Sequence, residues 1–288
     1  MWIADAFAKI NLGLHVLERM ADGYHRIETG FCFIEWCDRF EVLASPQFRL
    51  ELPESQIPAD ESNLITKAYR LFESTHGLKS QYRFKVLKKI PSGAGLGGGS
   101  SNAALTLRML NKLEQRELPD NELEAMAATL GADVPFFIRG ITGIGTGTGA
   151  EIEPLPIQPS AWIVTVWPGF ESSTAAAYKL CTPNPNPEFS LRETLLEEEP
   201  DQWRIFLEND LEGSVVSLYE MIGNMKDQLY DFGALYAAMS GSGSTVFGIF
   251  EQDFVAINAY ESFHKLGYAV NLTRPGFQPD YGIYFKEN

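Results

Sequence analysis

The chain has 288 residues and 45% of them are hydrophobic, which is enough to build either one large domain or two lobes. Its formal net charge of −15 disfavours nonspecific binding to nucleic acids or to anionic membranes. No apolar run approaches the roughly 18 residues of a membrane span, and an N-terminus with Asp5 and no basic segment is not typical of a signal peptide.

Two strands joined by a tight turn are predicted at the start of the chain. Residues 3–17 and 31–43 are rich in Ile, Leu, Val and Phe, and an Asp-Gly pair at 22–23 marks the turn between them. Lys9 and Asn11 interrupt the first of these strands. On the residues alone, such a Lys either lies at an edge or a solvated face, or points into a cleft.

An aromatic residue and an imidazole, Tyr24 and His25, follow the turn. On the residues alone, this pair is equally consistent with stacking on a base and with covering the end of the core. The next predicted element is a helix at residues 62–76, with Ser62 or Asn63 at its N-cap.

A dense glycine segment lies between a strand and a helix. It runs from Pro91 to Ala104 and reads PSGAGLGGGSSNAA. Apolar residues alternate in residues 81–90 before it, and helical spacing follows it, with Ser100 or Ser101 as the N-cap. Free backbone N–H groups and the positive end of the helix dipole make such a unit an anion cradle. The alternative, an ordinary tight turn, needs only one or two glycines.

Two well-known phosphate loops do not fit this segment. Gly93, Gly95 and Gly98 match G-x-G-x-x-G, but the acidic residue that ends the second strand of a dinucleotide fold is missing, because a helix still occupies that position. A Walker loop has Lys directly after its last glycine, and Ser100 stands there instead. A cation for the phosphates must therefore come from elsewhere in the chain.

Asp133 lies between a predicted helix at residues 119–131 and an apolar, strand-like run. At the end of an element, its carboxylate either serves a site or bonds to its own turn. Residues 141–151 are rich in glycine but lack a capped helix after them, so they predict a hairpin or a flexible loop. The proline-rich residues 153–161 mark the change from one lobe to the next.

The second half of the chain opens with a buried strand that ends at Pro168 and a short helix at residues 172–180. Further on, Gly241 and Gly243 are flanked by serines and precede a strand at 245–250. This segment is either a glycine loop that serves a binding site or an ordinary helix-to-strand turn. The other elements expected in this half are helices at 191–198, 202–208, 209–233 and 254–266 and a strand at 268–273.

Four segments of the chain resemble, in the same order, blocks of the GHMP kinase superfamily, named for galactokinase, homoserine kinase, mevalonate kinase and phosphomevalonate kinase. These segments are AKINLGLHVLERMADGYHRIET, the glycine segment, GADVPFF and AAMSGSGSTVFGIF. The superfamily's nucleotide loop has the form P-x-x-x-G-L-G-S-S-A-A, and here it reads GLGGGSSNAA. That variant and AKINLGLHVLERMADGYHRIET near the N-terminus are similar to the 4-diphosphocytidyl-2-C-methyl-D-erythritol kinase family, and GADVPFF further on resembles the third block of the superfamily. Ala150 inside a usual Gly-Glu pair and Tyr178 in place of the commoner Phe are departures that remove no needed group.

The resemblance implies an α+β, two-lobed GHMP kinase fold. Residues 1–155 would form an N-terminal lobe like domain 2 of ribosomal protein S5, carrying the ATP phosphate loop. Residues 156–288 would form a ferredoxin-like C-terminal lobe, with ATP and Mg²⁺ bound between the lobes.

The resemblance also implies a site. Lys9 and Asp133 would be catalytic, with Asp133 either a base or an electrostatic positioner of the acceptor hydroxyl. The substrate would be held by Asn11, Tyr24, His25, Thr174 and Tyr178. Of these, Tyr24, His25 and Tyr178 would form the slot for its cytosine. The ATP phosphates would lie on Pro91, Ser92, Gly93, Ala94, Gly95, Leu96, Gly97, Gly98, Gly99, Ser100 and Ser101. A C-terminal loop would close over them through Gly241, Ser242 and Gly243, and Mg²⁺ would arrive with ATP and contact Ser100 or Ser101.

The implied reaction transfers the γ-phosphoryl group of ATP to the 2-hydroxyl of 4-diphosphocytidyl-2-C-methylerythritol, in the non-mevalonate pathway to isoprenoids. The alternatives are another GHMP kinase, of mevalonate or homoserine type, and a non-catalytic nucleotide-binding member, against which the presence of Lys9 and Asp133 argues. The expected partners are these small molecules, without nucleic acid or membrane, in a monomer or a homodimer. An odd number of cysteines without metal-ligand spacing indicates reduced thiols and a cytoplasmic protein.

Overall fold

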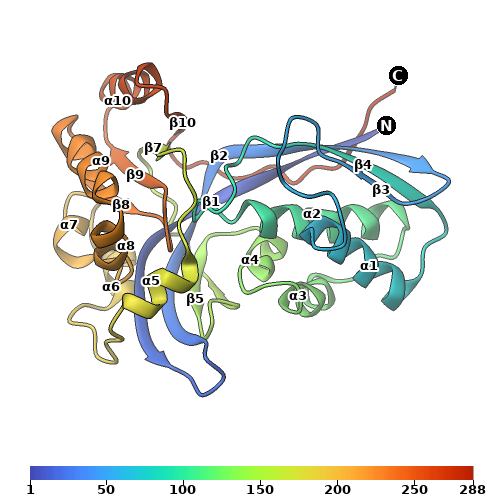
Figure 1. The fold of residues 1–288 in the computed structure, drawn as a ribbon, viewed down its shortest axis with the longest axis horizontal. Coiled ribbons are helices and arrows are strands. Elements are labelled where there is room, and N and C mark those ends of the chain that lie inside the picture. The colour runs from blue at the N-terminus through green and yellow to red at the C-terminus, as the bar shows by residue number, and fades with distance from the viewer. Residues whose placement is uncertain (288) are drawn as a thin grey trace.

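In the computed structural model, which describes residues 1–287, a long β-hairpin runs through the whole molecule (Figure 1). Its strands, β1 (Trp2–Arg19) and β2 (His25–Ser45), pair antiparallel and confirm the predicted hairpin. They have 18 and 21 residues, whereas a typical strand has about five or six. Successive apolar residues of β1 enter three hydrophobic cores in turn, so this one hairpin connects both lobes.

The first lobe is a mixed sheet with helices on one face. The strand order is β11-β1-β2-β4-β3, and β5 pairs with both β2 and β6. Figure 1 shows the helices α1 to α4 below the sheet, with α2 running along it and α1, α3 and α4 around α2. These elements are β3 (Arg49–Glu51), α1 (Leu64–His76), β4 (Gln81–Leu87), α2 (Gly98–Leu113), α3 (Asp120–Ala128), α4 (Val134–Arg139), β5 (Gly143–Thr146), β6 (Glu151–Pro154) and β11 (Tyr284–Phe285).

The second lobe is a four-stranded antiparallel sheet in the order β10-β7-β9-β8. Counted along the lobe, this is the order 4-1-3-2, with helices between the first and second strands and between the third and fourth. That order is the ferredoxin-like topology, and it confirms the expected two-lobed α+β fold. These elements are β7 (Trp162–Trp167), α5 (Thr174–Leu180), α6 (Leu191–Glu197), α7 (Trp203–Phe206), α8 (Glu212–Leu218), α9 (Glu220–Asp231), β8 (Tyr236–Met239), β9 (Val246–Phe250), α10 (Asp253–Lys265) and β10 (Ala269–Thr273).

Two local predictions around the glycine segment and Asp133 were wrong. The apolar run after Asp133 is the helix α4 and not a strand; it is buried all round, so its sequence lacks the polar face that would reveal helical period. The helix begins inside the glycine segment, at Gly98, with Gly97 as its N-cap at φ 67°. Ser100 and Ser101 therefore lie inside the first turn of α2 and do not cap it.

The C-terminal tail returns to the first lobe. The last strand of the second sheet ends at Thr273, and β11 then pairs with β1. The expected division into residues 1–155 and 156–288 did not include this return, and Asn288 lies outside the described residues. The strands β8 and β11 were not predicted, and the helix expected at 209–233 is divided at Tyr219 into α8 and α9.

The three cysteines are free thiols, as expected. Burial raises the pKa of the Cys37 thiol to about 11 and raises that of Cys32 further. Within residues 1–287, no helix is both long enough and apolar enough to cross a bilayer.

Candidate functional site

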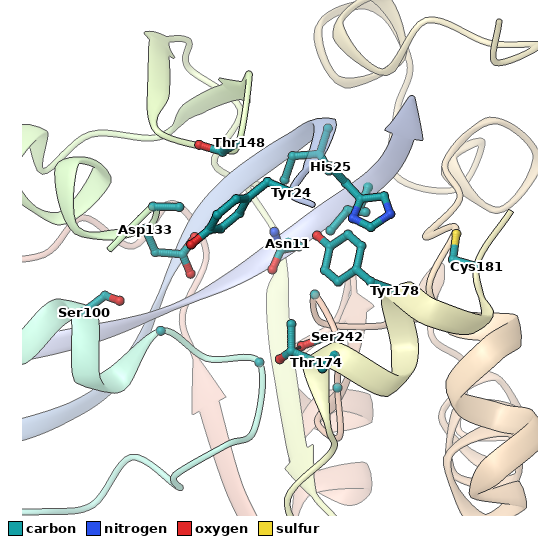
Figure 2. Close-up of a pocket in the computed structure, with 18 of the residues that line it drawn as sticks. Asn11, Tyr24, His25, Ser100, Asp133, Thr148, Thr174, Tyr178, Cys181 and Ser242 are labelled. Atoms are coloured by element: carbon teal, nitrogen blue, oxygen red, sulfur yellow. Dashed lines mark hydrogen bonds between the residues drawn. The ribbon is translucent and has the colours of Figure 1, made fainter. Parts of the chain in front are cut away.

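A cavity of about 840 Å³ opens between the two lobes, and its walls come from distant parts of the chain. β1 and the turn into β2 form one wall, the glycine segment and the residues before α4 a second, and α5 with the loop after β8 a third (Figure 2). The cavity collects the expected catalytic and substrate-binding residues and the expected C-terminal loop: Lys9, Asn11, Tyr24, His25, Asp133, Thr174, Tyr178, Gly241, Ser242 and Gly243.

Lys9 and Asp133 meet in the wall of this cavity. Lys9 Nζ lies 3.4 Å from Asp133 Oδ2 and donates to Asn11 Oδ1 at 2.6 Å. Lys9 is 3% exposed, whereas the Asp133 side chain is 34% exposed. The ammonium is thus enclosed, in contrast to the solvated Lys that is the simpler alternative, and the carboxylate remains accessible from the cavity.

The hairpin and the start of α4 hold these groups in place. Lys9 and Asn11 share one face of β1, because side chains alternate along a strand. Asn11 Nδ2 donates to Thr29 Oγ1 at 2.9 Å, and Thr29 Oγ1 donates to Gly13 O at 2.6 Å, which turns the Asn11 amide oxygen toward the ammonium. Asp133 precedes α4 but makes no capping bond to it, so its carboxylate is free to face Lys9.

The glycine segment turns its carbonyl groups toward the rest of the protein. Four consecutive carbonyls accept hydrogen bonds from outside the segment: Gly93 O from Ser172 N (3.2 Å), Ala94 O from Thr245 N (3.2 Å), Gly95 O from Ser240 Oγ (2.9 Å) and Leu96 O from Lys9 N (3.1 Å). Within residues 1–287, no acceptor takes the N–H of Gly93, Gly95 or Gly97. These donors are therefore left for an anion.

A second cavity, of about 360 Å³, lies on the other side of the glycine segment. Gly93, Gly95, Gly97 and Ser100 line both cavities, so the segment is the wall that they share. Apolar and polar side chains from residues 52–65 form the opposite side of the second cavity. The other expected ATP-binding residues that line it are Pro91, Ser92, Ala94, Leu96, Gly98 and Gly99.

Ser100 and Ser101, the two alternatives for a metal contact, differ in access. Ser101 is 1% exposed, lines neither cavity and donates its hydroxyl to Phe7 O at 2.6 Å. Ser100 lines both cavities. No three His, Cys, Asp or Glu side chains gather to hold a metal in residues 1–287. The donors at hand, the Ser100 hydroxyl and the Asp133 carboxylate, fit an ion that is ligated mainly by the phosphates of a nucleotide.

The serine-glycine loop after β8, residues 240–245, connects the walls of the cavity. Ser240 Oγ accepts from Asn11 N at 3.2 Å and donates to Gly95 O at 2.9 Å, so the loop touches both β1 and the glycine segment. The hydroxyls of Thr174 and Ser242 lie 2.8 Å apart, which connects the loop to α5. The loop joins two strands, so the helix-to-strand turn that was the alternative is wrong.

An aromatic group, formed by the rings of Tyr24, His25 and Tyr178, lines one end of the cavity. The rings of His25 and Tyr178 stack with centroids 4.9 Å apart at 29°, and Tyr24 at the hairpin tip is 66% exposed (Figure 2). Burial, and then the charge of Arg19, lower the pKa of His25 below its ordinary 6.5. Burial, and then the charge of Asp133, raise the pKa of Tyr178. Both rings are thus uncharged at neutral pH.

Two cations of the cavity were missed by sequence reasoning. Arg19, at the end of β1, and Lys179, on α5, line it beside the aromatic group. With Lys9 they give three cations against one carboxylate, Asp133, so the cavity is positive in a chain of net charge −15. The sequence gives no signal for them, because isolated basic residues at the ends of elements are common on any surface.

Comparison with known families matches both halves of the chain. Residues 63–141 match the family model described as GHMP kinases N terminal domain, and residues 191–269 match GHMP kinases C terminal.

Individual relatives are similar over most of the chain. A protein named 4-diphosphocytidyl-2-C-methyl-D-erythritol kinase from Parabacteroides distasonis is 43% identical, over 85% of this chain and 90% of the relative. A protein of the same name from Chlorobium phaeobacteroides is 39% identical, over 94% and 96% of the two chains. A crystal structure of 4-(cytidine 5'-diphospho)-2C-methyl-D-erythritol kinase superposes with a TM-score of 0.80 at 33% identity, over 94% of this chain and 98% of the other.

Proposed function

Because the chain belongs to the 4-diphosphocytidyl-2-C-methyl-D-erythritol kinase family of GHMP kinases, we propose that it phosphorylates the 2-hydroxyl of 4-diphosphocytidyl-2-C-methyl-D-erythritol with ATP. The observation that carries the proposal is the Lys9–Asp133 pair, which lines the same cavity as the glycines whose N–H groups are free. The product is an intermediate of the methylerythritol phosphate pathway to isoprenoids.

ATP binds along the glycine segment. Its nucleoside enters the second cavity, and its phosphates pass over the free N–H groups of Gly93, Gly95 and Gly97 into the first cavity. The positive end of α2 adds to the attraction. Ser100 is the hydroxyl that would contact a Mg²⁺ ion arriving with ATP, and such an ion would supply neutralisation of part of the phosphate charge.

The acceptor hydroxyl lies between the γ-phosphate and Asp133. Asp133 takes the hydroxyl proton while the substrate oxygen forms a bond to phosphorus and the bond from phosphorus to the ADP oxygen breaks. Lys9 holds Asp133 in position and stabilises the charge that develops on the transferred group, and Asn11 fixes the Lys9 ammonium.

The cytidine diphosphate part of the substrate occupies the aromatic end. His25 covers one face of Tyr178, so the cytosine stacks on the other face, and the exposed ring of Tyr24 closes over it. The edge of His25 is left for hydrogen bonds to the base. Thr174 contacts the substrate from the adjoining wall.

Arg19 and Lys179 neutralise the diphosphate of the substrate. Lys179→Gln is expected to raise the KM for the cytidine substrate by about two- to fivefold, the size of a partly exposed ion pair. The KM for ATP should not change, and Lys265→Gln, on the outer surface of α10, is the matched control. Equal effects of the two substitutions would exclude Lys179 from the site.

We place this reaction in the cytoplasm, in line with the three free thiols. All residues of the proposed site come from one chain, so both a monomer and a homodimer can carry it out.

An ADP-release assay with the diphosphocytidyl substrate tests the proposal, and phosphorus NMR of the product identifies the phosphorylated hydroxyl. Mevalonate and homoserine serve as comparison acceptors, and CDP as a competitor. Turnover of the cytidine substrate with inhibition by CDP is expected. Turnover of mevalonate or homoserine without any effect of CDP would overturn the proposal.

A further inference from the structure

A buried polar cluster anchors both ends of the glycine segment and lies outside the chemistry described above. Asp38 on β2 is fully buried. Its Oδ1 accepts the main-chain N–H of Lys89 at 2.7 Å and of Ile90 at 2.9 Å, just before the segment begins. Its Oδ2 accepts from Asn102 Nδ2 at 2.9 Å, in the first part of α2, near the end of the segment.

Lys88 closes the cluster. Its Nζ pairs with Asp38 Oδ2 and donates to Asn102 Oδ1 at 2.7 Å, and its side chain is 10% exposed. Each member therefore bonds to the other two, and the buried negative charge is matched. Apolar residues of similar volume would stabilise strand–helix packing equally well or better, because bringing two charges out of water is costly. Stability alone does not explain why this site is polar.

We infer that Asp38, Lys88 and Asn102 are positioning residues for nucleotide binding. The inference rests on the proposed function, since it takes ATP as the ligand of the glycine segment. One carboxylate holds both the chain that enters the segment and the helix that leaves it, so it fixes the distance between the two ends. The spacing of the free N–H groups follows from that distance. Lys88 and Asn102 also line the second cavity, where the proposal puts the nucleoside.

The substitution Asp38→Asn tests this. It preserves the shape of the side chain and the oxygen that accepts the two main-chain N–H groups, but places an amide NH₂ against two donors, the Lys88 ammonium and the Asn102 amide. Calorimetric titration with AMP-PNP is expected to show a Kd about tenfold or more above that of the wild type, the loss from one charge-assisted hydrogen bond. The Kd for CDP should change less than about twofold.

Asn102→Ala is the second variant, in case Asp38→Asn does not fold. It removes only the link to α2 and leaves the Asp38–Lys88 pair and both main-chain bonds intact. The same selective loss of AMP-PNP binding is expected, with a smaller magnitude.

The other end of the same strand and helix offers a matched control. Glu114, at the C-cap of α2, is 1% exposed and accepts from Tyr82 Oη at 2.6 Å and from Lys79 N at 2.7 Å. Glu114→Gln is therefore expected to lower the melting temperature as Asp38→Asn does, yet to leave AMP-PNP binding unchanged.

Two results would overturn the inference: AMP-PNP binding by Asp38→Asn at the wild-type Kd, or an equal loss of binding in Glu114→Gln. Because binding is read without turnover, a wild-type protein that binds AMP-PNP but does not phosphorylate the cytidine substrate would overturn the proposed function alone. The comparison of the variants would still decide the inference.

Discussion

The Asp133 carboxylate lies 3.4 Å from the Lys9 ammonium, and its other side is open to the cavity. Asp133→Asn keeps the size of the side chain and removes its charge and its capacity to take a proton. The kcat should fall by about 10²- to 10⁴-fold, the usual contribution of a general base. An ADP-release assay at saturating substrate measures it.

The affinity for AMP-PNP serves as the control for Asp133→Asn and should remain at the wild-type value, because the glycine segment is untouched. If kcat stayed within about tenfold of wild type, Asp133 would have no direct part in the reaction.

His25 gives the reaction a dependence on pH. Its pKa is lowered below 6.5 by burial and by Arg19, so above pH 6.5 the neutral ring predominates, with one nitrogen as donor and one as acceptor for the base. The KM for the cytidine substrate should therefore rise as the ring takes up a proton, and it should reach twice its value at pH 8 only below pH 6.5. Steady-state kinetics across this range measure it, with His25→Gln as a variant that should show no such rise. A KM that has already doubled above pH 6.5 would contradict the lowered pKa.

Single residues also show which features of the site a local sequence pattern can predict and which it cannot. Lys9 and Asp133 each had two interpretations from the sequence, because a pattern within a few residues does not reveal what lies opposite. The family resemblance, and not the pattern, brought the two together, and their 3.4 Å separation agrees with it. Asp38 carried no signal at all, since its partners at 88–90 and 102 become neighbours only when β2, β4 and α2 pack.

The glycine segment depends on a close approach of two loops. Gly95 has φ 77°, and a Cβ there would lie 2.1 Å from the carbonyl oxygen of Ser240. Gly95→Ala must therefore push the segment away from the loop after β8. AMP-PNP affinity, measured by calorimetry, should fall by at least about tenfold, because small displacements of binding groups have large effects.

Gly267→Ala separates this clash from backbone strain. Gly267 also has a positive φ, 89°, but no atom of residues 1–287 lies within 4 Å of a Cβ there. It should lower stability and leave AMP-PNP binding unchanged. If Gly95→Ala bound AMP-PNP as tightly as Gly267→Ala does, contact between the two loops would not matter for the nucleotide.

Helices and strands whose apolar residues repeat with a clear period were predicted well, whereas short or fully buried elements were not. The hairpin, α1, α10 and the strand β7 follow their patterns. The sequence of α4 was misread because a helix buried on all sides has no polar face to reveal its period. β8 consists of YAAM, in which two alanines give little strand preference, and only pairing with β9 makes it a strand.

At the scale of the molecule, the two lobes share the strand β1 and a hydrophobic core, so they are not independent domains. β1 contributes residues to all three cores, and the core that contains Ala8 and Ile10 also contains Ile163 and Phe247 of the second sheet. β1 is one continuous strand that runs past both lobes (Figure 1). The cavity between the lobes is therefore built on this strand. This explains how Lys9 and Asn11 can be held within hydrogen-bonding distance of groups from both lobes.

The tail after β10 binds the second lobe back onto the first. Both termini lie at the same end of the first sheet (Figure 1), where the main chains of Met1 and Lys286 exchange hydrogen bonds of 3.1 and 2.8 Å. Phe277 is 3% exposed, and its ring centroid lies 5.4 Å from that of Phe7 in the first core. A tail that only followed the surface would not bury an aromatic side chain so deeply.

Phe277→Ala should therefore lower the free energy of unfolding by about 3–5 kcal/mol, the usual cost of removing a buried Phe. Urea denaturation measures it. Phe254→Ala is the matched control, because Phe254 on α10 is 65% exposed, and its cost should stay within about 0.5 kcal/mol. Similar small costs for both would mean that the tail does not stabilise the first lobe. A large cost for Phe277→Ala alone would show that residues after the second sheet, which no local pattern assigned to the first lobe, complete its core.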